Sequence, residues 1–167
     1  DGSLWCWGMN ELGQLGIGYD NLFKKLPQQV GTDTDWKVVD TGWLHTCAIP
    51  NDGALWCWGL NYYGQIGNGQ MTFQENVPVK VGTNDWLTVT AGKSHTCAIK
   101  SDGSMWCWGR NNFGQLGLGY ISRHQWTPMQ VGTGTDWTKV EAGYDYTCAL
   151  KTDKSLWCWG ANTTGQL

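Results

Sequence analysis

A tetrapeptide, Trp-Cys-Trp-Gly, occurs four times in this chain of 167 residues, beginning at Trp5, Trp56, Trp106 and Trp157. Gly-Gln-Leu or Gly-Gln-Ile keeps the same step, beginning at positions 13, 64, 114 and 165, and Asp-Trp begins at positions 35, 85 and 136. Landmarks that recur together at a period near fifty residues, without helical periodicity between them, are typical of blade-like β units. The repeat therefore predicts an array of equivalent β-sheets.

Each repeat contains a predicted β-hairpin. In the first full copy, two short β-prone runs at 45–49 and 54–58 are joined by a cluster of turn-forming residues with Asp-Gly in it. Placing Cys47 opposite Cys57 pairs Ala48 with Trp56 and leaves residues 51–53 as the loop. The same register fits the two later copies.

The predicted hairpin is apolar on both faces. Because strand side chains alternate, the two cysteines share one face with Ile49 and Leu55, whereas Trp56 and Trp58 point to the other face. Such a sheet has to be covered on both sides, and in a tandem array the neighbouring repeats cover it. Residues 78–81 and 86–89 supply two more strands, which makes about four strands per repeat. The fold class is therefore all-β, a propeller of four-stranded blades of about fifty residues. The motif tryptophans are expected in its structural core: Trp5, Trp7, Trp56, Trp58, Trp106, Trp108, Trp157 and Trp159.

The pattern Gly-x-x-His-Thr-Cys-Ala-Ile, Asp-Gly, Leu-Trp-Cys-Trp-Gly-x-Asn-x-x-Gly-Gln-Leu-Gly resembles the regulator of chromosome condensation repeat. The resemblance covers the whole chain and implies a β-propeller, usually of seven four-stranded blades. Members of that family include a nuclear exchange factor for a small GTPase, a plant ultraviolet-B photoreceptor and a secreted bacterial inhibitor of β-lactamase. The paired cysteines favour a bacterial-type, secreted variant, and the fold is better determined than the function.

The chain holds about three and a third repeats. A single array over 1–167 divides into a partial repeat at 1–40, repeats at 41–90 and 91–141, and a partial repeat at 142–167. Because the two ends carry the same repeat segment, we expect an excerpt of a seven-bladed propeller or a longer array. The alternative is a short chain that completes itself by assembly.

The cysteines predict three disulfides and one unpaired thiol. The cross-strand register pairs Cys47 with Cys57, Cys97 with Cys107 and Cys148 with Cys158, and it leaves Cys6 alone. Each bridge closes a loop of roughly ten residues, worth on the order of 2 to 3 kcal/mol in the chain-entropy model. Paired cysteines indicate an oxidising compartment, so the protein is expected to be secreted or at the cell surface.

Metal binding by the same groups is the alternative, because His45 lies on the strand face of Cys47 and Cys57. It fails at the third copy, where Tyr146 replaces the histidine and a fourth ligand is missing. Reduced core cysteines in a cytosolic protein are a further alternative. No metal and no cofactor are expected.

No catalytic constellation is visible, and we expect a non-enzyme. His45 and His95 are repeat positions that suit packing between blades, and no nucleophile motif, phosphate loop or carboxylate pair is present. A net charge of -3 argues against a nucleic-acid partner, and no apolar run is long enough for a membrane span. The photoreceptor motif Gly-Trp-Arg-His-Thr is approached only once, with Leu44 in place of its arginine; the neighbouring Trp43 has Lys93 and Tyr144 as its equivalents.

Specificity is expected where the copies diverge. After Gly-Gln-Leu-Gly-x-Gly the sequences at 19–26, 70–77 and 120–127 differ and carry aromatic residues. A second divergent set lies on a turn, at 62–63, 112–113 and 163–164. The alternative for any one aromatic is a small packing cluster that holds a long loop down. The candidate binding residues are Tyr19, Phe23, Phe73, Tyr120, Arg123, His124 and Trp126.

Two functions follow as hypotheses. The first is a non-catalytic extracellular recognition or adhesion module that binds a protein or a glycan through these divergent loops. The second is a structural subunit of an extracellular fibre or surface assembly, in which copies of the chain stack through their apolar blade faces.

Overall fold

The computed structural model describes residues 1–19 and 22–167, and in this part of the chain every regular element is a β-strand. The described residues contain no helix that could span a membrane. The strands are β1 (Trp5–Met9), β2 (Phe23–Gln29), β3 (Trp36–Thr41), β4 (His45–Pro50), β5 (Leu55–Leu60), β6 (Gln74–Val81), β7 (Trp86–Ala91), β8 (His95–Lys100), β9 (Met105–Arg110), β10 (His124–Gln130), β11 (Trp137–Ala142), β12 (Tyr146–Lys151) and β13 (Leu156–Gly160).

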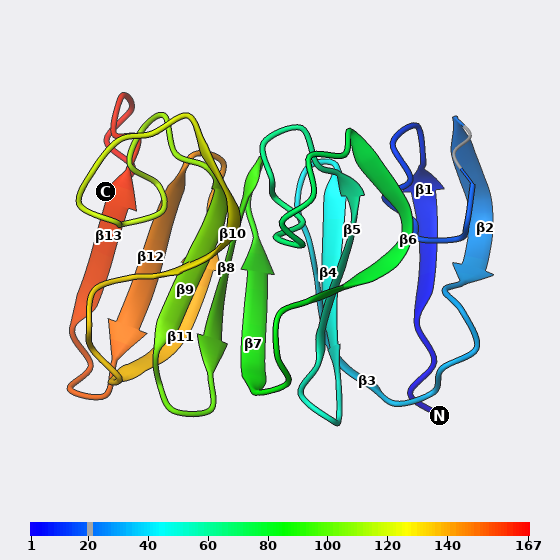
Figure 1. Cartoon of the computed structure of the whole chain (residues 1–167), viewed down its shortest axis with the longest axis horizontal. Coiled ribbons are helices and arrows are strands. Elements are labelled where there is room, and N and C mark those ends of the chain that lie inside the picture. Colours follow the sequence, from blue (N-terminus) through cyan, green and yellow to red (C-terminus); the bar gives the residue numbers. More distant parts are fainter. Residues whose placement is uncertain (20–21) are drawn as a thin grey trace.

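The strands form four antiparallel sheets that stand side by side like the blades of a propeller (Figure 1). The two middle sheets have four strands each, in the orders β3-β4-β5-β6 and β7-β8-β9-β10. They are flanked by the two-stranded sheet β1-β2 and the three-stranded sheet β11-β12-β13. The first strands β3, β7 and β11 approach one another, so they form the inner side of the array.

The predicted hairpin register is confirmed. Cys47 faces Cys57 and Ala48 faces Trp56 across β4 and β5, and the later copies repeat this pairing. Gly53 has a φ of 75°, a conformation that costs glycine little, and the Asp52 carboxylate accepts the backbone N–H of Ala54 at 2.9 Å. The three predicted disulfides are present in the structure: Cys47–Cys57, Cys97–Cys107 and Cys148–Cys158.

Successive blades pack the disulfide face of one sheet against the tryptophan face of the next. The core between the two complete blades joins Cys47, Cys57 and Leu55 of the first to Ala98 and Trp108 of the second, all of them buried. This is the face-to-face packing that the two apolar faces of the hairpin predict. Burying a large aromatic side chain in this way is worth several kcal/mol at each junction.

Three of the eight tryptophans predicted as core are not core. Trp58 and Trp108 are fully buried, and Trp56, Trp106 and Trp159 are partly buried. In contrast, Trp5, Trp7 and Trp157 expose 48%, 61% and 53% of their surface. The reason is geometric: within the described residues no blade covers the outer face of β1, and no fourth strand lies beside β13. The motif directs a tryptophan side chain toward the next blade. The side chain is buried only where a neighbouring sheet is present to cover it.

Buried histidines also connect the blades. His45 Nε2 lies 2.9 Å from Thr96 Oγ1 in the next blade, and His95 Nε2 lies 3.0 Å from Thr147 Oγ1. Burial lowers the pKa of His45 to about 3, with a smaller contribution from the charge of His95, and it lowers the pKa of His95 to about 4. Both side chains are therefore neutral hydrogen-bonding groups at neutral pH.

These pKa values predict that acid weakens the fold before carboxylates titrate. Between their ordinary pKa of 6.5 and the folded values of about 4 and 3, the unfolded chain binds more protons than the folded chain. The free energy of unfolding is therefore at its full value above pH 6.5 and falls as pH is lowered, by up to about 1.4 kcal/mol per pH unit for each histidine.

Urea denaturation at a series of pH values between 4 and 7.5 measures this slope. In the double variant His45→Gln, His95→Gln the slope should shrink, even though the variant is less stable throughout. An unchanged slope in the variant would mean that other groups carry the acid sensitivity.

Candidate functional site

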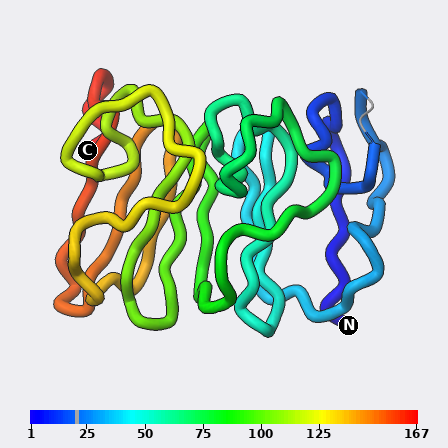
Figure 2. Tube along the Cα trace, in the orientation of Figure 1, coloured from blue at the N-terminus to red at the C-terminus, as the bar shows by residue number. Residues whose placement is uncertain are grey.

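The connections between strands lie on two opposite edges of the array (Figure 2). The long-loop edge contains the described parts of the connections after third strands, at 10–19, 61–73 and 111–123, and the short inner turns at 42–44, 92–94 and 143–145. The hairpin edge contains the tight turns at 51–54, 101–104 and 152–155 and the links between blades. A propeller usually places its ligand on one such edge, because loops vary while the sheets hold them.

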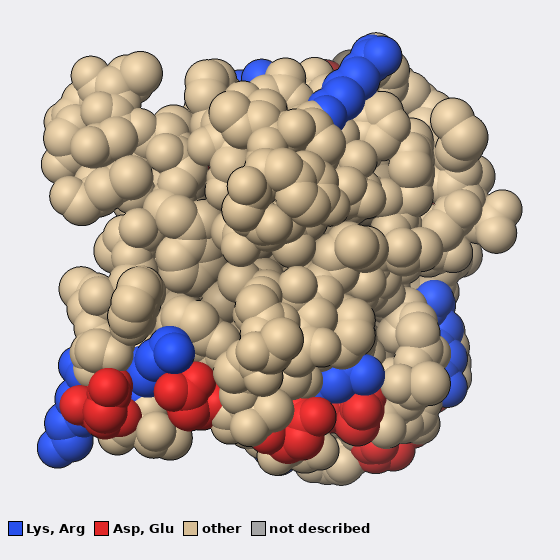
Figure 3. Space-filling view, turned by 60° about the vertical axis from the view of Figure 1, so that its left-hand side comes forward, with Lys and Arg blue, Asp and Glu red and all other residues tan. Residues whose placement is uncertain are grey.

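On the face drawn in Figure 3, charged side chains gather mainly along the hairpin edge. Asp, Glu, Lys and Arg line the lower rim, a few Lys or Arg side chains stand at the top, and the surface between them is mostly uncharged. Part of this rim is paired, since Lys100 lies 3.1 Å from Asp85 and Lys151 lies 3.3 Å from Asp136. The lysine of each pair is half-buried against tryptophan rings, so these charges are already engaged within the blades.

The long loops rest on a repeated polar frame. Asn61 is fully buried; its amide donates to the backbone carbonyl of Gln70 at 2.9 Å, and its side-chain oxygen accepts the N–H of Ile66 at 3.1 Å. The carboxamide oxygen of Gln65 accepts the N–H of Tyr63 at 2.9 Å. Asn111 and Gln115 repeat these bonds in the next copy. The Asn and Gln residues that recur in each copy therefore hold the loop from its buried side. The residues that differ between copies lie on its exposed side.

On the outer part of this edge, Tyr62 gathers two predicted residues. Its hydroxyl accepts a hydrogen bond of 3.3 Å from Arg123, which comes from the next repeat, and its ring lies 6.4 Å from that of Phe73. Tyr63 packs edge-on against Tyr62 at 4.9 Å. Tyr62 and Phe73 expose 47% and 59% of their surface, so this cluster presents aromatic rings and a cation to solvent.

On the inner part, the short turns of three successive repeats meet. Lys93 Nζ lies 4.9 Å from the centre of the Trp43 ring and 4.2 Å from the centre of the Tyr144 ring, and the two rings are 6.2 Å apart. Both rings remain more than half exposed. Sequence reasoning compared these three equivalent positions only with a photoreceptor motif and did not name them as candidates. Their shared repeat position was the signal that could have found them.

Arg110 connects the two clusters. Its guanidinium lies 3.5 Å from the carboxylate of Asp145, which follows Tyr144 in the chain, and it lies 5.4 Å from the rings of both Tyr63 and Phe113. A continuous series of contacts therefore runs across three repeats. We call this surface the aromatic strip, and it consists of Trp43, Lys93, Tyr144, Asp145, Arg110, Phe113, Tyr63, Tyr62, Phe73 and Arg123.

The other predicted residues have different surroundings. Trp126 is partly buried, and its backbone and ring lie against Gly64, where a Cβ would come within about 3 Å of them. His124 packs edge-on against Trp126 at 5.0 Å, and burial, followed by the charge of Arg123, lowers the pKa of His124. The loop-packing alternative fits this pair. Tyr120 accepts a 3.2 Å hydrogen bond from Gln125.

Tyr19, in the connection between β1 and β2, and Phe23, the first residue of β2, lie outside the aromatic strip. Lys24 lies 4.8 Å from the Tyr19 ring, and Lys25 lies 5.6 Å from the Phe23 ring. Asp20 and Asn21 of this divergent segment lie outside the described residues. The structure therefore brings together two of the predicted candidates, Phe73 and Arg123, and surrounds them with residues that were not predicted.

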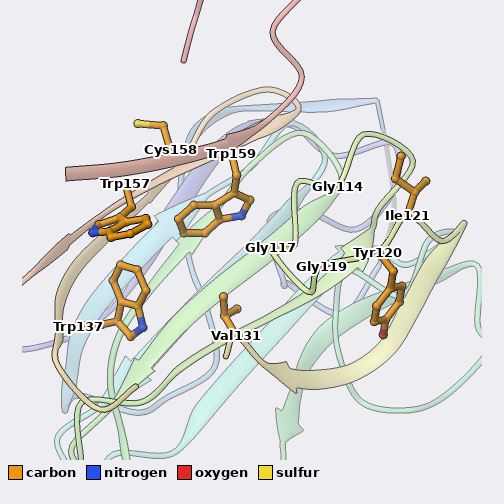
Figure 4. Close-up of a pocket in the computed structure, with 10 residues that line it drawn as sticks. All are labelled: Gly114, Gly117, Gly119, Tyr120, Ile121, Val131, Trp137, Trp157, Cys158 and Trp159. Carbon is orange, nitrogen blue, oxygen red and sulfur yellow. The ribbon is translucent and has the colours of Figure 1, made fainter. Parts of the chain in front are cut away.

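A hollow of about 460 Å³ lies beside the last sheet (Figure 4). Trp137, Trp157 and Trp159 line one side of it, and Tyr120 and Ile121 lie across from them. Among the described residues that line this hollow, none carries a charged side chain. Across residues 1–19 and 22–167, no group of three His, Cys, Asp or Glu side chains is placed to hold a metal ion.

The contacts of Arg110 predict a measurable contribution to stability. In Arg110→Met the carboxylate of Asp145, which is only 15% exposed, loses its cation, so the free energy of unfolding should fall by about 1 to 2 kcal/mol. The matched control is Lys139→Met, because Lys139 pairs with Glu141 at 3.1 Å but both side chains are more than 60% exposed. That change should stay within about 0.5 kcal/mol of the parent. Urea denaturation compares the two, and equal losses would contradict the assignment.

Comparison with known proteins shows where this arrangement recurs. The model of the regulator of chromosome condensation (RCC1) repeat matches residues 1–49, 52–99 and 102–150, and a second model of that repeat matches 36–65, 87–115 and 137–166. The ultraviolet-B receptor UVR8 of Arabidopsis thaliana is 37% identical over 73 residues, which is 42% of this chain and 16% of the receptor. The X-linked retinitis pigmentosa GTPase regulator homolog of Caenorhabditis elegans is 34% identical over 84 residues, or 48% of this chain and 6% of that protein.

Solved structures show the same fold. Yeast RCC1 (Prp20), solved bound to Kap60, superimposes with a TM-score of 0.85 at 22% identity, covering 98% of this chain and 41% of the yeast chain. Human WBSCR16 gives 0.84 at 22% identity, with 98% and 44% covered. The chain thus spans less than half of these proteins and less than a fifth of the curated relatives that it matches. With family matches across nearly all of its length and a propeller architecture, the chain belongs to the RCC1 repeat family.

Proposed function

We propose that this chain is a non-catalytic recognition module that binds a protein partner through the aromatic strip. The observation that carries the proposal is the pair of contact clusters between Trp43 and Arg123 on the long-loop edge, joined through the neighbouring residues Tyr144 and Asp145 and built by residues of three repeats that differ from copy to copy. Tyr, Trp and Arg dominate the binding energy of protein interfaces, and Tyr and Trp do so because they bury large areas with few rotatable bonds.

The distribution of charge supports a protein ligand. Within the aromatic strip, Arg110 pairs with Asp145, Lys93 lies over two rings and Arg123 donates to Tyr62, so the strip carries two cations beyond its one ion pair. Protein interfaces have this composition at their centre, with aromatic residues and arginine enriched and other charges depleted. Nucleic-acid partners instead require an excess of cations, which the net charge of -3 does not supply.

Relatives support the same class of function. The yeast relative was solved with Kap60 bound, and a second structure of Prp20p was described with its binding to Gsp1p and histones. These are properties of those proteins, and they indicate that a propeller of this family presents surfaces for protein partners. One relative, the probable ubiquitin-protein ligase HERC6 of Homo sapiens, is an enzyme, but this chain covers only 8% of it.

We also infer an extracellular setting. Three cross-strand disulfides in the core are characteristic of proteins that fold in an oxidising compartment. The inference that the chain is not an enzyme is supported by its histidines, since His45 and His95 are buried between blades and bonded to threonines. Neither is placed to exchange protons with a ligand at the surface.

Site-specific photo-crosslinking tests the proposal. A photoreactive phenylalanine analogue at position 62 should give a discrete crosslinked protein from the extracellular fraction of the producing organism, whereas the same analogue at the exposed hairpin-edge position 102 should not. With the captured partner purified, Arg123→Ala and Tyr62→Ala should each weaken binding about 10- to 100-fold, as expected for central interface residues.

The control variant is Lys139→Ala, outside the aromatic strip, which should bind like the parent. Equal binding by the parent and both strip variants would overturn the proposal. Binding that disappears after enzymatic deglycosylation of the partner would identify a glycan ligand instead, and crosslinking of the chain to itself would favour a structural assembly.

A further inference from the structure

In the second complete blade, a lysine at the end of the second strand lies over two tryptophan rings. Lys100 Nζ lies 4.8 Å from the centre of the Trp86 ring and 5.0 Å from the centre of the Trp106 ring. The same nitrogen lies 3.1 Å from the carboxylate of Asp85. Because the side chain of Lys100 is only 16% exposed, two rings and one carboxylate hold this ammonium group largely out of water.

The last sheet builds the same site. Lys151 Nζ lies 4.7 Å from the centre of the Trp137 ring and 5.4 Å from the centre of the Trp157 ring. It also lies 3.3 Å from the carboxylate of Asp136. Figure 4 shows these two rings next to each other. In both copies the first-strand tryptophan is paired with the lysine across two strands, so the repeat itself builds a site for an alkylammonium group.

The first complete blade keeps the frame of this site but has no lysine there. Trp36 is paired with Pro50, which stands where the later copies have the lysine. The backbone carbonyl of Asp35 accepts the N–H of Asn51 at 3.0 Å, and the two equivalent aspartate carbonyls accept the corresponding N–H groups. Trp36 packs edge-on against Trp58 at 6.4 Å, close to the 5.9 and 6.1 Å of the equivalent pairs. The tryptophan and the aspartate therefore keep their places, whereas the cation is replaced by proline.

A hollow of about 350 Å³ lies at this position. Its lining includes Trp36 and Trp56, which are the equivalents of the two rings over each lysine, and both are partly buried. The other lining residues come from the segments 16–18, 29–33 and 77–78, and none comes from β1. The two rings and the substitution at Pro50 belong to one complete blade, so the site is a property of that blade.

The first copy also has one more acid than its equivalents. Asp33 lines the hollow, whereas Gly134 stands at this place in the third copy and Asn84 in the shorter link of the second. Within the described residues, neither Asp33 nor Asp35 forms an ion pair. Two carboxylates therefore stand where each later copy has one carboxylate and one ammonium group. This charge is complementary to a cation from outside the chain.

Two lysines lie beside this position but do not fill it. Lys37 follows Trp36 in the chain, and Lys80 is paired with Trp56 across β5 and β6. Both lysines are exposed, and neither lines the hollow. In the part of the chain that the structure describes, neither lies over the ring of Trp36 or Trp56, in contrast to the lysines of the later copies.

We propose that this hollow binds the ammonium group of a lysine side chain supplied by another polypeptide. The rings of Trp36 and Trp56 contact the ammonium group, and the carboxylates of Asp33 and Asp35 accept its hydrogen bonds. The two later copies carry the assignment, because each holds a lysine ammonium with the same two rings and an aspartate. The inference goes beyond the proposed function, since no residue of the aromatic strip lines the hollow.

Nuclear magnetic resonance of the indole N–H groups tests the inference. The nitrogen-labelled chain is titrated with Nα-acetyl-lysine N-methylamide and with the same probe acetylated on Nε, which keeps the stem but has no charge. The charged probe should shift the indole signals of Trp36 and Trp56 saturably and leave that of Trp43 in place. The neutral probe should bind about tenfold more weakly, because it loses both the ring and the carboxylate attraction.

Equal binding of the two probes would overturn the inference. Butylammonium has the stem and the charge of the lysine side chain without the peptide groups. If it bound more tightly than the charged lysine probe, the site would belong to a free amine and the polypeptide assignment would be wrong.

Position 50 provides a matched pair of variants. Pro50→Lys restores the lysine of the later copies, and its new backbone N–H faces the carbonyl of Ala54, as Lys100 faces the carbonyl of Ser104 at 2.9 Å. The restored side chain occupies the hollow, so the affinity for the charged probe should fall about tenfold or more. Pro50→Ala adds no cation and should bind like the parent. Equal affinities in the two variants would overturn the inference.

The carboxylates are tested by variants that keep their size. Asp33→Asn and Asp35→Asn should each weaken binding of the charged probe about three- to tenfold, because a charge-assisted hydrogen bond becomes a neutral one. Glu11→Gln, which removes an exposed acid outside the hollow, should bind like the parent. If both aspartate variants also bound like the parent, the inference would be wrong, and this result does not depend on whether Pro50→Lys folds.

Discussion

The whole array depends on one backbone carbonyl per junction. In the turn Gly-Gln-Leu or Gly-Gln-Ile, the glutamine carbonyl accepts two hydrogen bonds from the next blade: Trp108 Nε1 at 3.0 Å and Thr96 Oγ1 at 2.7 Å reach Gln65. The same geometry recurs at Gln14 and Gln115. Because the indole N–H is satisfied there, the rest of the ring can be buried on the disulfide face of the neighbouring sheet. The same tryptophan therefore both donates a hydrogen bond to the preceding blade and packs its ring in the apolar core.

Much of the fold could be predicted from the sequence because it depends on how apolar and polar side chains alternate along short strands. The facing of Cys47 and Cys57 follows from period-two side chains and a short turn, and the need for two neighbouring blades follows from the two apolar faces of that hairpin. The exposure of Trp7 and Trp157 could not be predicted in the same way. A motif fixes the direction of a side chain, whereas burial depends on whether another sheet stands in front of it.

The aromatic strip shows a second feature that sequence analysis could not predict. Its contacts join residues 51 and 61 positions apart, such as Lys93 with Tyr144 and Tyr62 with Arg123. These pairs depend on the rotation between successive sheets, which no single repeat encodes. Divergence between copies identified Phe73 and Arg123, but Tyr62, Arg110 and Trp43 became recognisable only when three repeats were seen together. Conversely, divergence also selected Trp126, which lies in β10 and packs its ring against Gly64 in the loop of the preceding repeat.

The glycine below each buried indole has a further consequence for how such arrays change. Gly67 has a φ of 80° and lies against the Trp108 ring, so neither its backbone conformation nor the space beside it tolerates a side chain. Gly16 and Gly117 occupy the same place at the other two junctions. Since every junction is chemically alike, gaining or losing one whole period preserves all remaining contacts, whereas a cut within a period separates the glutamine carbonyl from its tryptophan. Duplication in units of about fifty residues is therefore the change in length that this architecture accepts at the lowest cost in stability.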